Sequence, residues 1–397
     1  HITQDYAAQL IFGGIPASGK MPVSAGQLFP EGTGITLASH TRLKYSVPED
    51  AGVNAAILYK VDSIANSAIE NEATPGCQIL CVKDNTVFYR KSFGHHTYLE
   101  SVEVKNEDLY DIASLTKITA TLPALMKLYE EDQIDIDQPL SNYLPYLDST
   151  DKKEIKIKDV LAHQGRLIPW IPFYLETIDT AKLEKDLFSR RYSKTHRIKL
   201  HRRIYMNANY EFKEEIFAEK DTDNYVQVAD DFFINRNYRD TMIRTIADTP
   251  LLEKTEYRYS DLGFYLFQDI VESKTQKPLN EYVNDVFYEK LGMNYTGYLP
   301  LMRFCKMNIV PTEDDKIFRN QLVHGYVHDP GAAMLGGVAG HAGVFSTAND
   351  LAKIMQLYLN RGAYGGETFF EPETIDLFTS APFTKQNNRR GLGFDKP

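Results

Sequence analysis

Hydrophobic residues recur along this chain with two distinct periods, which predict both helices and strands. Apolar positions three and four residues apart mark one helix at 57–68 and another that begins near residue 114. Between them, residues 77–82 and 86–93 are rich in strand-forming side chains and flank Asp84-Asn85, a typical hairpin turn. A helix, a hairpin and a second helix in this order favour an α+β fold, with helices packed on an antiparallel sheet.

The same patterns divide the rest of the chain. Residues 1–42 are rich in Gly and Pro and are interpreted as the tail of a preceding domain with its linker, so the main domain is expected at 43–397. A short helix is expected within 155–165, an insertion at 171–250, and a turn followed by two helices at 257–293. A glycine-rich loop then leads into a helix capped at Ser346 or Thr347.

Ser114 and Lys117 stand where the second helical pattern begins. Residues at positions i and i+3 of a helix lie on one face, so the amine is expected beside the hydroxyl near the helix N-terminus. Free amide N–H groups there favour developing negative charge. Serine is also a common helix cap and lysine a common surface residue, so the pair alone leaves a structural role open.

Composition narrows the class of protein. The chain has 397 residues, a net charge of −10 and 43% hydrophobic residues, typical of a folded globular protein and unfavourable for nucleic-acid binding. No apolar run is long enough to span a membrane. No H-E-x-x-H or C-x-x-C spacing indicates a metal site, and His95, His96 and His163 are interpreted as structural, so no cofactor is expected.

Several blocks together resemble the serine β-lactamase-related superfamily, which includes class C β-lactamases, penicillin-binding DD-peptidases, esterases and amidases. They are "YDIASLTKITATLPALMKLYEEDQIDIDQPLSNYLP", "IKIKDVLAHQG", "YRYSDLGFYLFQDIVESKTQKPLNEYV" and "GHAGVFSTANDLAKIM", in the family's order. The resemblance implies a nucleophile at Ser114, a lysine base at Lys117 and a tyrosine at Tyr259. It further implies an acyl-enzyme that water hydrolyses.

Two features depart from the family pattern. Asp261 stands where the family has asparagine, and a carboxylate cannot donate a hydrogen bond to a substrate carbonyl, so penicillin-type substrates are disfavoured. His341-Ala342-Gly343 resembles the family's third motif, but we expect it to lie off a strand because the next helix follows so closely. The genuine third motif and the C-terminal strands of the sheet are expected beyond Pro397.

Residues 7–24, "AAQLIFGGIPASGKMPVS", resemble the closing segment of a family 3 glycoside hydrolase, a family that includes β-N-acetylglucosaminidases. A covalently linked glycosidase implies cell-wall recycling in the periplasm or envelope of a bacterium. The predicted function is therefore an amidase or peptidase acting on muropeptides. A carboxylesterase or β-lactamase is the alternative, and a non-catalytic sensor with the penicillin-binding fold is a second one.

The segment "RRYSKTHRIKLHRR", residues 190–203, contains seven Arg or Lys and no acidic residue. It is interpreted either as a solvated loop or as a lid that attracts an anionic substrate. In the second interpretation the substrate-binding residues are Asp261 and the arginines Arg190, Arg191, Arg202 and Arg203.

Overall fold

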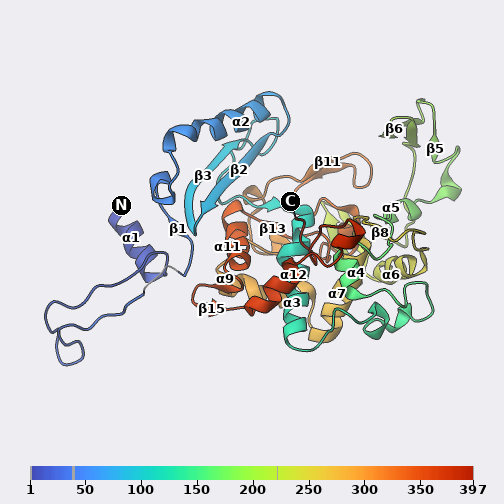
Figure 1. Cartoon of the computed structure of the whole chain (residues 1–397). Helices are drawn as coiled ribbons and strands as arrows, with labels where there is room; N and C mark the ends of the chain where they lie inside the picture. The colour runs from blue at the N-terminus through green and yellow to red at the C-terminus, as the bar shows by residue number, and fades with distance from the viewer. Residues whose placement is uncertain (1, 38–40, 221, 397) are drawn as a thin grey trace. The chain divides into compact units, whose positions relative to one another are not determined.

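The computed structural model describes residues 2–37, 41–220 and 222–396, which form two compact units (Figure 1). Unit 1 contains the described residues up to Asp108 together with Val286–Tyr295 and Thr347–Asp376. Unit 2 contains Leu109–Asp285, Thr296–Ser346 and the described residues from Leu377 onwards. The domain boundary near residue 43 and the limits of the insertion stay predictions.

The predicted hairpin forms the sheet of unit 1. Strands β2 (Gly76–Lys83) and β3 (Thr86–Gly94) pair antiparallel, and β1 (Lys44–Tyr45) adds to β3 in parallel. Asp84 and Asn85 both have positive φ, 49° and 64°, which matches the right-handed twist of the two strands. The hairpin prediction is confirmed.

Helices pack on this sheet, as Figure 1 shows for α2 (Tyr59–Glu70). Asp62 on α2 accepts hydrogen bonds from the Tyr89 hydroxyl and from Lys91 Nζ, the latter at 2.9 Å. The helix predicted after the glycine-rich loop is α11 (Ala348–Leu359), and Thr347 caps it by accepting from the Asp350 N–H. The remaining elements with bounds in or overlapping unit 1 are α1 (Ile2–Ile11), α9 (Glu289–Leu291), α12 (Pro372–Thr379), β14 (Ala363–Tyr364) and β15 (Glu367–Thr368).

Unit 2 is built on two buried helices, α3 (Leu122–Glu130) and α7 (Leu262–Thr275), which contact each other. Both present apolar faces that are almost wholly shielded from solvent, and burial of apolar surface stabilises the unit. The other helices of unit 2 are α4 (Ile157–Leu161), α5 (Phe173–Glu176), α6 (Tyr238–Asp248), α8 (Leu279–Val283) and α10 (Pro330–Met334).

Small antiparallel sheets complete unit 2. Two have three strands, ordered β5-β7-β6 and β8-β10-β9, and two are pairs, β11-β12 and β4-β13. The predicted α+β class is confirmed, although the described chain has several small antiparallel sheets where one antiparallel sheet with helices packed on it was expected. The strands are β4 (Tyr110–Asp111), β5 (Phe188–Ser189), β6 (His196–His201), β7 (Ile204–Asn207), β8 (Phe217–Ala218), β9 (Tyr225–Ala229), β10 (Phe232–Asn235), β11 (Glu313–Asp315), β12 (Gln321–Val323) and β13 (Phe345–Ser346).

Within the part of the chain that the structure describes, no helix is both long enough and apolar enough to cross a bilayer.

A buried ion pair holds the β11–β12 hairpin to the segment that follows it. The Arg319 side chain is fully buried, and its Nε donates to Asp315 Oδ2 at 3.0 Å. Its other nitrogens donate to the carbonyls of Val327 and His328, at 2.6 and 2.8 Å. Burial raises the pKa of Asp315, but backbone N–H bonds and the guanidinium outweigh it, so the net pKa is lowered.

We expect Asp315→Asn to lower the free energy of unfolding by about 1.5–3 kcal/mol, because it removes one of the two carboxylates that pair with the buried Arg319 and leaves only Glu313, at 3.0 Å. Asp314→Asn, in the same strand but exposed, is the matched control and should change it by less than about 1 kcal/mol. Urea titration measures both.

The pH dependence of this difference is a second test. A carboxyl whose folded-state pKa is lowered stabilises the protein above its unfolded pKa of about 4 and loses that contribution as the pH falls. The difference in free energy of unfolding between wild type and Asp315→Asn should therefore become smaller at acidic pH. A difference that becomes larger would contradict the lowered pKa of Asp315.

Candidate active site

Ser114 lies on a strained turn between β4 and a buried helix. The preceding residue, Ala113, has φ 46°, a left-handed conformation that costs free energy for a residue with a Cβ. Asp111 holds the turn, because its Oδ1 accepts from the Ala113 N–H at 2.7 Å and its Oδ2 from the His328 N–H at 2.6 Å. Burial raises the pKa of Asp111. The turn leaves Ser114 itself exposed to solvent.

Lys117 begins a π-helical turn, Lys117–Thr121, rather than the regular α-helix that the apolar stripe predicts. Ser114 belongs to a 3₁₀ turn before it, and α-helical geometry is reached only at Leu122. The Leu122 N–H bonds to the Lys117 carbonyl, five residues back, as in a π-helical turn. Pro123 follows and has no N–H to donate to the carbonyl four residues earlier, so a regular α-helical bond is also missing at this place.

The Lys117 amine is buried, with the residue 2% exposed, and three oxygens surround it. Its Nζ lies 2.8 Å from Ser114 Oγ and 3.2 Å from the backbone carbonyl oxygen of His341, to both of which it donates. Asp261 Oδ1 lies 2.6 Å away and forms an ion pair whose angle is not that of a hydrogen bond. The structure thus brings Ser114, Lys117 and Asp261 together.

Aromatic rings close the remaining sides of the amine. Nζ lies 5.1 Å from the ring centroid of Tyr259 and 5.5 Å from that of Phe264. The Arg390 guanidinium lies 5.6 Å from the same Tyr259 ring. Among the described residues, no hydrogen bond joins the Tyr259 hydroxyl to Ser114 or Lys117. Tyr259 therefore presents its ring, and not its hydroxyl, to the amine in this state.

His163 positions the turn that carries Tyr259. Its ring lies 4.4 Å from the Tyr259 ring, and its Nδ1 accepts the Ser260 N–H at 3.2 Å. Burial, with the charges of Arg390 and Lys117, lowers the pKa of His163 to about 2, so the ring is neutral. These contacts agree with the structural role predicted for His163. Within the described ranges, no group of three or more His, Cys, Asp or Glu side chains is arranged to hold a metal ion.

The loop that supplies the His341 carbonyl is fixed on α7. The His341 ring stacks on Tyr265 with centroids 4.2 Å apart, and Gln268 Oε1 accepts the Gly340 N–H at 3.2 Å. A Cβ at Gly340 would lie 2.1 Å from the Phe264 carbonyl oxygen, so only glycine allows this close approach.

Asp329 anchors the other end of His341. Its Oδ1 lies 2.7 Å from His341 Nε2, and its carboxylate also caps α10 by accepting the Ala332 N–H at 2.8 Å. Burial raises the pKa of Asp329, but the His341 charge and hydrogen bond outweigh it and hold that pKa well below its usual range. Sequence reasoning missed Asp329, because Asp329-Pro330 is the ordinary signature of a helix start and carries no catalytic signal.

His341 lies in a bend and not on a strand, as predicted. The sequence predicted no strand between Gly343 and the next helix. The structure differs here, because Phe345–Ser346 forms a short strand, β13, which pairs with β4. The absence of the family's third motif from the described chain stays a prediction.

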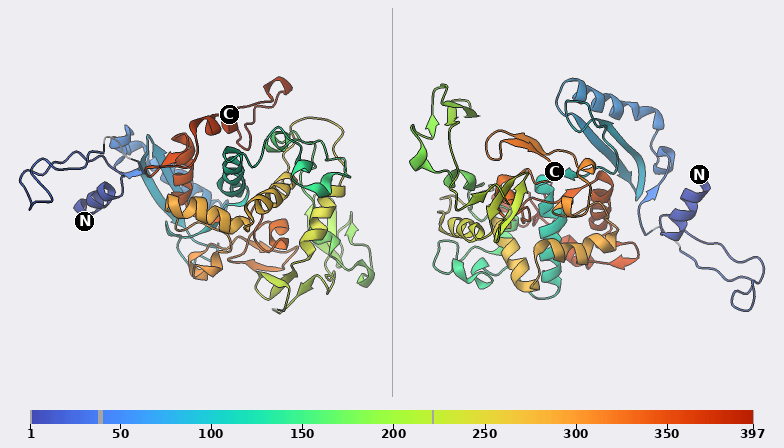
Figure 2. Two further views of the ribbon diagram at one scale, coloured as in Figure 1. Left: turned by 90° about the horizontal axis from the view of Figure 1, so that it is seen from below. Right: turned by 180° about the vertical axis from the view of Figure 1, so that it is seen from behind.

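The four arginines predicted to bind substrate lie away from this cluster. Arg190, Arg191, Arg202 and Arg203 are exposed, and Figures 1 and 2 show β5 and β6 on an arm that projects from the rest of unit 2. The structure gives none of them a hydrogen bond or ion pair with Ser114, Lys117 or Asp261, and their role in substrate binding stays a prediction.

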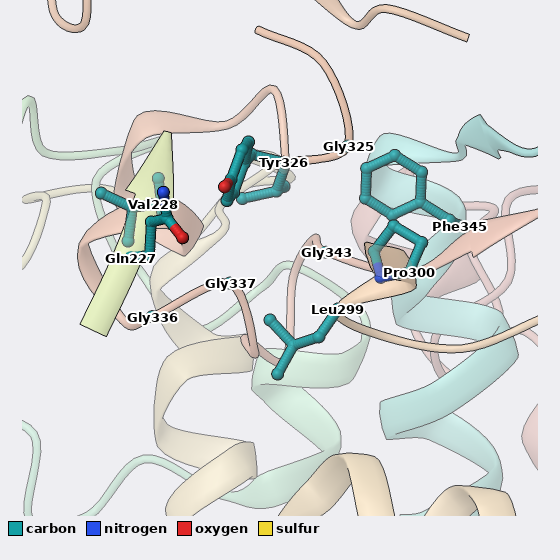
Figure 3. Close-up of a pocket in the computed structure, with 12 residues that line it drawn as sticks. Gln227, Val228, Leu299, Pro300, Gly325, Tyr326, Gly336, Gly337, Gly343 and Phe345 are labelled. Atoms are coloured by element: carbon teal, nitrogen blue, oxygen red, sulfur yellow. The ribbon is translucent and has the colours of Figure 1, made fainter. Parts of the chain in front are cut away.

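Figure 3 shows a separate small pocket beside Gly343 and Phe345. Leu299, Tyr326 and Val228 contribute to its lining, and none of the residues around Lys117 does. Its volume of about 20 Å³ suits roughly one water molecule, so it is too small for an acyl substrate.

A comparison against protein families places the chain. The model of the family described as Beta-lactamase matches residues 61–395. The chain belongs to this family. It is accordingly a serine hydrolase of the β-lactamase-related type, as the sequence predicted.

Curated relatives of this Beta-lactamase-family chain come from enteric bacteria. A protein of Escherichia coli strain K12, named "Putative D-alanyl-D-alanine carboxypeptidase", is 29% identical over 387 residues, covering 91% of this chain and 76% of that protein. A protein of Salmonella gallinarum with the same name is 28% identical, covering 85% of this chain and 72% of the relative.

Solved structures share the fold at low identity. FmtA from Staphylococcus aureus has a TM-score of 0.56 at 15% identity, covering 99% of this chain and 82% of that one. The octameric penicillin-binding protein homologue from Pyrococcus abyssi has a TM-score of 0.54 at 19% identity, covering 82% of this chain and 61% of that one. These similarities establish the fold alone.

Asp261 provides a test of how the amine is controlled. We expect Asp261→Asn to lower the rate of Ser114 acylation by about tenfold, because the carboxylate oxygen 2.6 Å from Lys117 Nζ no longer holds the amine beside the serine hydroxyl. Labelling rates with a fluorophosphonate measure it. Asp285→Asn, which removes an exposed carboxylate, is the control, and an unchanged rate in Asp261→Asn would contradict the proposed coupling.

Proposed function

We propose that this protein is a serine peptidase that cleaves amide bonds in peptidoglycan-derived peptides through an acyl-enzyme on Ser114. The observation that carries the proposal is the 2.8 Å contact between an exposed serine hydroxyl and a buried lysine amine. The names of the curated relatives support the substrate class, since they give D-alanyl-D-alanine carboxypeptidase.

The proton must leave Ser114 as its oxygen attacks. An ammonium cannot accept a proton, so the reactive form needs a neutral Lys117 amine. Asp261 Oδ1, 2.6 Å from Nζ, holds the Lys117 side chain beside Ser114 Oγ, so that the neutral amine is placed to accept the serine proton. The His341 carbonyl accepts a remaining N–H and orients the amine.

The reaction then proceeds in two stages, acylation of Ser114 and hydrolysis of the acyl-enzyme. Ser114 Oγ bonds to the acyl carbon, the carbon–nitrogen bond breaks, and the proton held by the lysine passes to the leaving amine. A water molecule next attacks the ester, giving its proton to the same base, and the carboxylic acid is released as Ser114 regains its proton. The Tyr259 ring faces the cations of Lys117 and Arg390. Tyr259 is the second candidate to carry the proton, if bound substrate turns its hydroxyl toward Ser114.

Muropeptides in cell-wall recycling are the finer substrate assignment. The resemblance of residues 7–24 to the end of a family 3 glycoside hydrolase supports it, because a linked glycosidase would act on the sugar of the same fragments. An envelope location is part of this proposal.

Labelling with a fluorophosphonate, followed by peptide mass spectrometry, tests the nucleophile. We expect one adduct, on Ser114, and none in Ser114→Ala, whereas Lys117→Ala should lower the labelling rate roughly 10²–10⁴-fold. Ser149→Ala removes an exposed serine remote from any such lysine contact and should label normally. A folded protein without an adduct on Ser114 would contradict the enzyme assignment.

Substrate class needs a separate measurement. Incubation with peptides ending in D-Ala-D-Ala, with and without a muramyl group, should release D-alanine faster than a simple ester is hydrolysed. If Ser114 is labelled but only the ester is cleaved, the protein is a serine hydrolase and the peptidase assignment is wrong.

A further inference from the structure

The projecting arm of unit 2, residues 188–207, has a charge that the catalytic cluster does not use. We refer to it as the basic arm. Its seven Arg and Lys side chains are exposed at 190, 191, 194, 197, 199, 202 and 203. Among the described residues, none of the seven forms an ion pair, although the chain as a whole has a net charge of −10. Concentrated positive charge without counter-ions favours an anionic partner.

Strand pairing sorts the side chains of the basic arm onto two faces. Met206 lies opposite Phe188 on one side and Ile198 on the other, so these three share an apolar face. Tyr205 lies opposite Ser189 and Lys199, which makes the reverse face polar and cationic. The three strands form the sheet β5-β7-β6, which is separate from the other sheets of unit 2.

The apolar face borders an open hollow of about 470 Å³. Phe188 and Ile204, 44% and 42% exposed, lie at the hollow with Leu200 and Leu175. Arg190 lines the same hollow, and Arg202 and Arg203 directly precede Ile204 in the chain. Cationic residues therefore stand next to an apolar cavity.

We propose that the basic arm is a docking surface for an anionic lipid bilayer. Lipid headgroups would neutralise the arginines, each worth about 1 kcal/mol near such a surface, while the hollow and the exposed rings take up apolar chain. Tyr192, 68% exposed and packed edge-on against Tyr205, has the amphipathic character found at membrane interfaces.

The position of the arm supports a surface partner rather than a substrate lid. A body of net negative charge is repelled by an anionic membrane, and this repulsion fades over about 8 Å at physiological salt. Because the arm projects from the rest of unit 2, its cations can reach the headgroups while the remainder of that unit stays farther away (Figure 2). A soluble polyanion would need the charges but would gain nothing from Phe188 and Ile204.

Vesicle co-sedimentation tests the charge contribution. We expect the protein to bind vesicles of phosphatidylglycerol and phosphatidylcholine, to bind phosphatidylcholine alone poorly, and to be released by 0.5 M salt. The variant R190S/R191S/R202S/R203S should bind at least roughly 100-fold more weakly. K60S/K254S/K290S/K385S removes as many exposed, unpaired positive charges elsewhere and should bind like wild type or slightly more weakly. Circular dichroism verifies that each variant is folded.

The apolar contribution separates a bilayer from other anionic partners. F188S/I204S should weaken vesicle binding by roughly tenfold while leaving binding to heparin, a soluble polyanion, unchanged. The proposal is wrong if the two four-site variants lose vesicle binding equally. It is also wrong if the wild-type protein does not bind anionic vesicles. If heparin binds as tightly as vesicles do, and F188S/I204S weakens neither interaction, the basic arm binds polyanions instead. These outcomes do not depend on the labelling of Ser114.

Discussion

The burial of one ammonium group organises the candidate active site. A lysine that is 2% exposed loses its hydration, and that loss is tolerated only where protein oxygens and ring faces replace the water. Lys117 obtains them from three separate parts of unit 2: the Ser114 turn, the start of α7 and the loop at His341. Each of these parts must be in place for the amine to be accommodated, so the same contacts that stabilise it also assemble the nucleophile with its base.

The contacts that support this arrangement are mostly hydrogen bonds to the backbone. Asp111 holds the strained Ala113 turn through two N–H groups, one of them from His328. Arg319 binds the carbonyls of Val327 and His328 from the other side. The chain then continues directly to Asp329 and its partner His341. The buried Arg319–Asp315 pair is thereby linked, through His328, to the residues that orient the lysine.

Charge is distributed unevenly for a physical reason. At the candidate active site Lys117 is buried and paired with Asp261, and Arg390 is buried against the Tyr259 ring, so their fields act over a few ångströms inside the protein. The cations of the basic arm are exposed and project from unit 2, where only a partner outside the protein can neutralise them. Chemistry and the proposed surface attachment therefore occupy different parts of the same unit.

The sequence by itself determined what depends on near neighbours. The Asp84-Asn85 hairpin, the cap at Thr347 and the proximity of Ser114 to Lys117 all follow from spacings of a few residues, because local backbone geometry allows few alternatives. The order of the family's blocks extended this to Tyr259 and Asp261. Tertiary structure alone decided which groups meet the amine: the His341 carbonyl lies 224 residues from Lys117 in the chain, and no side-chain pattern signals a backbone oxygen. It also decided that Tyr259 presents its ring and that the arginines stand on an arm, because both depend on how separate elements pack.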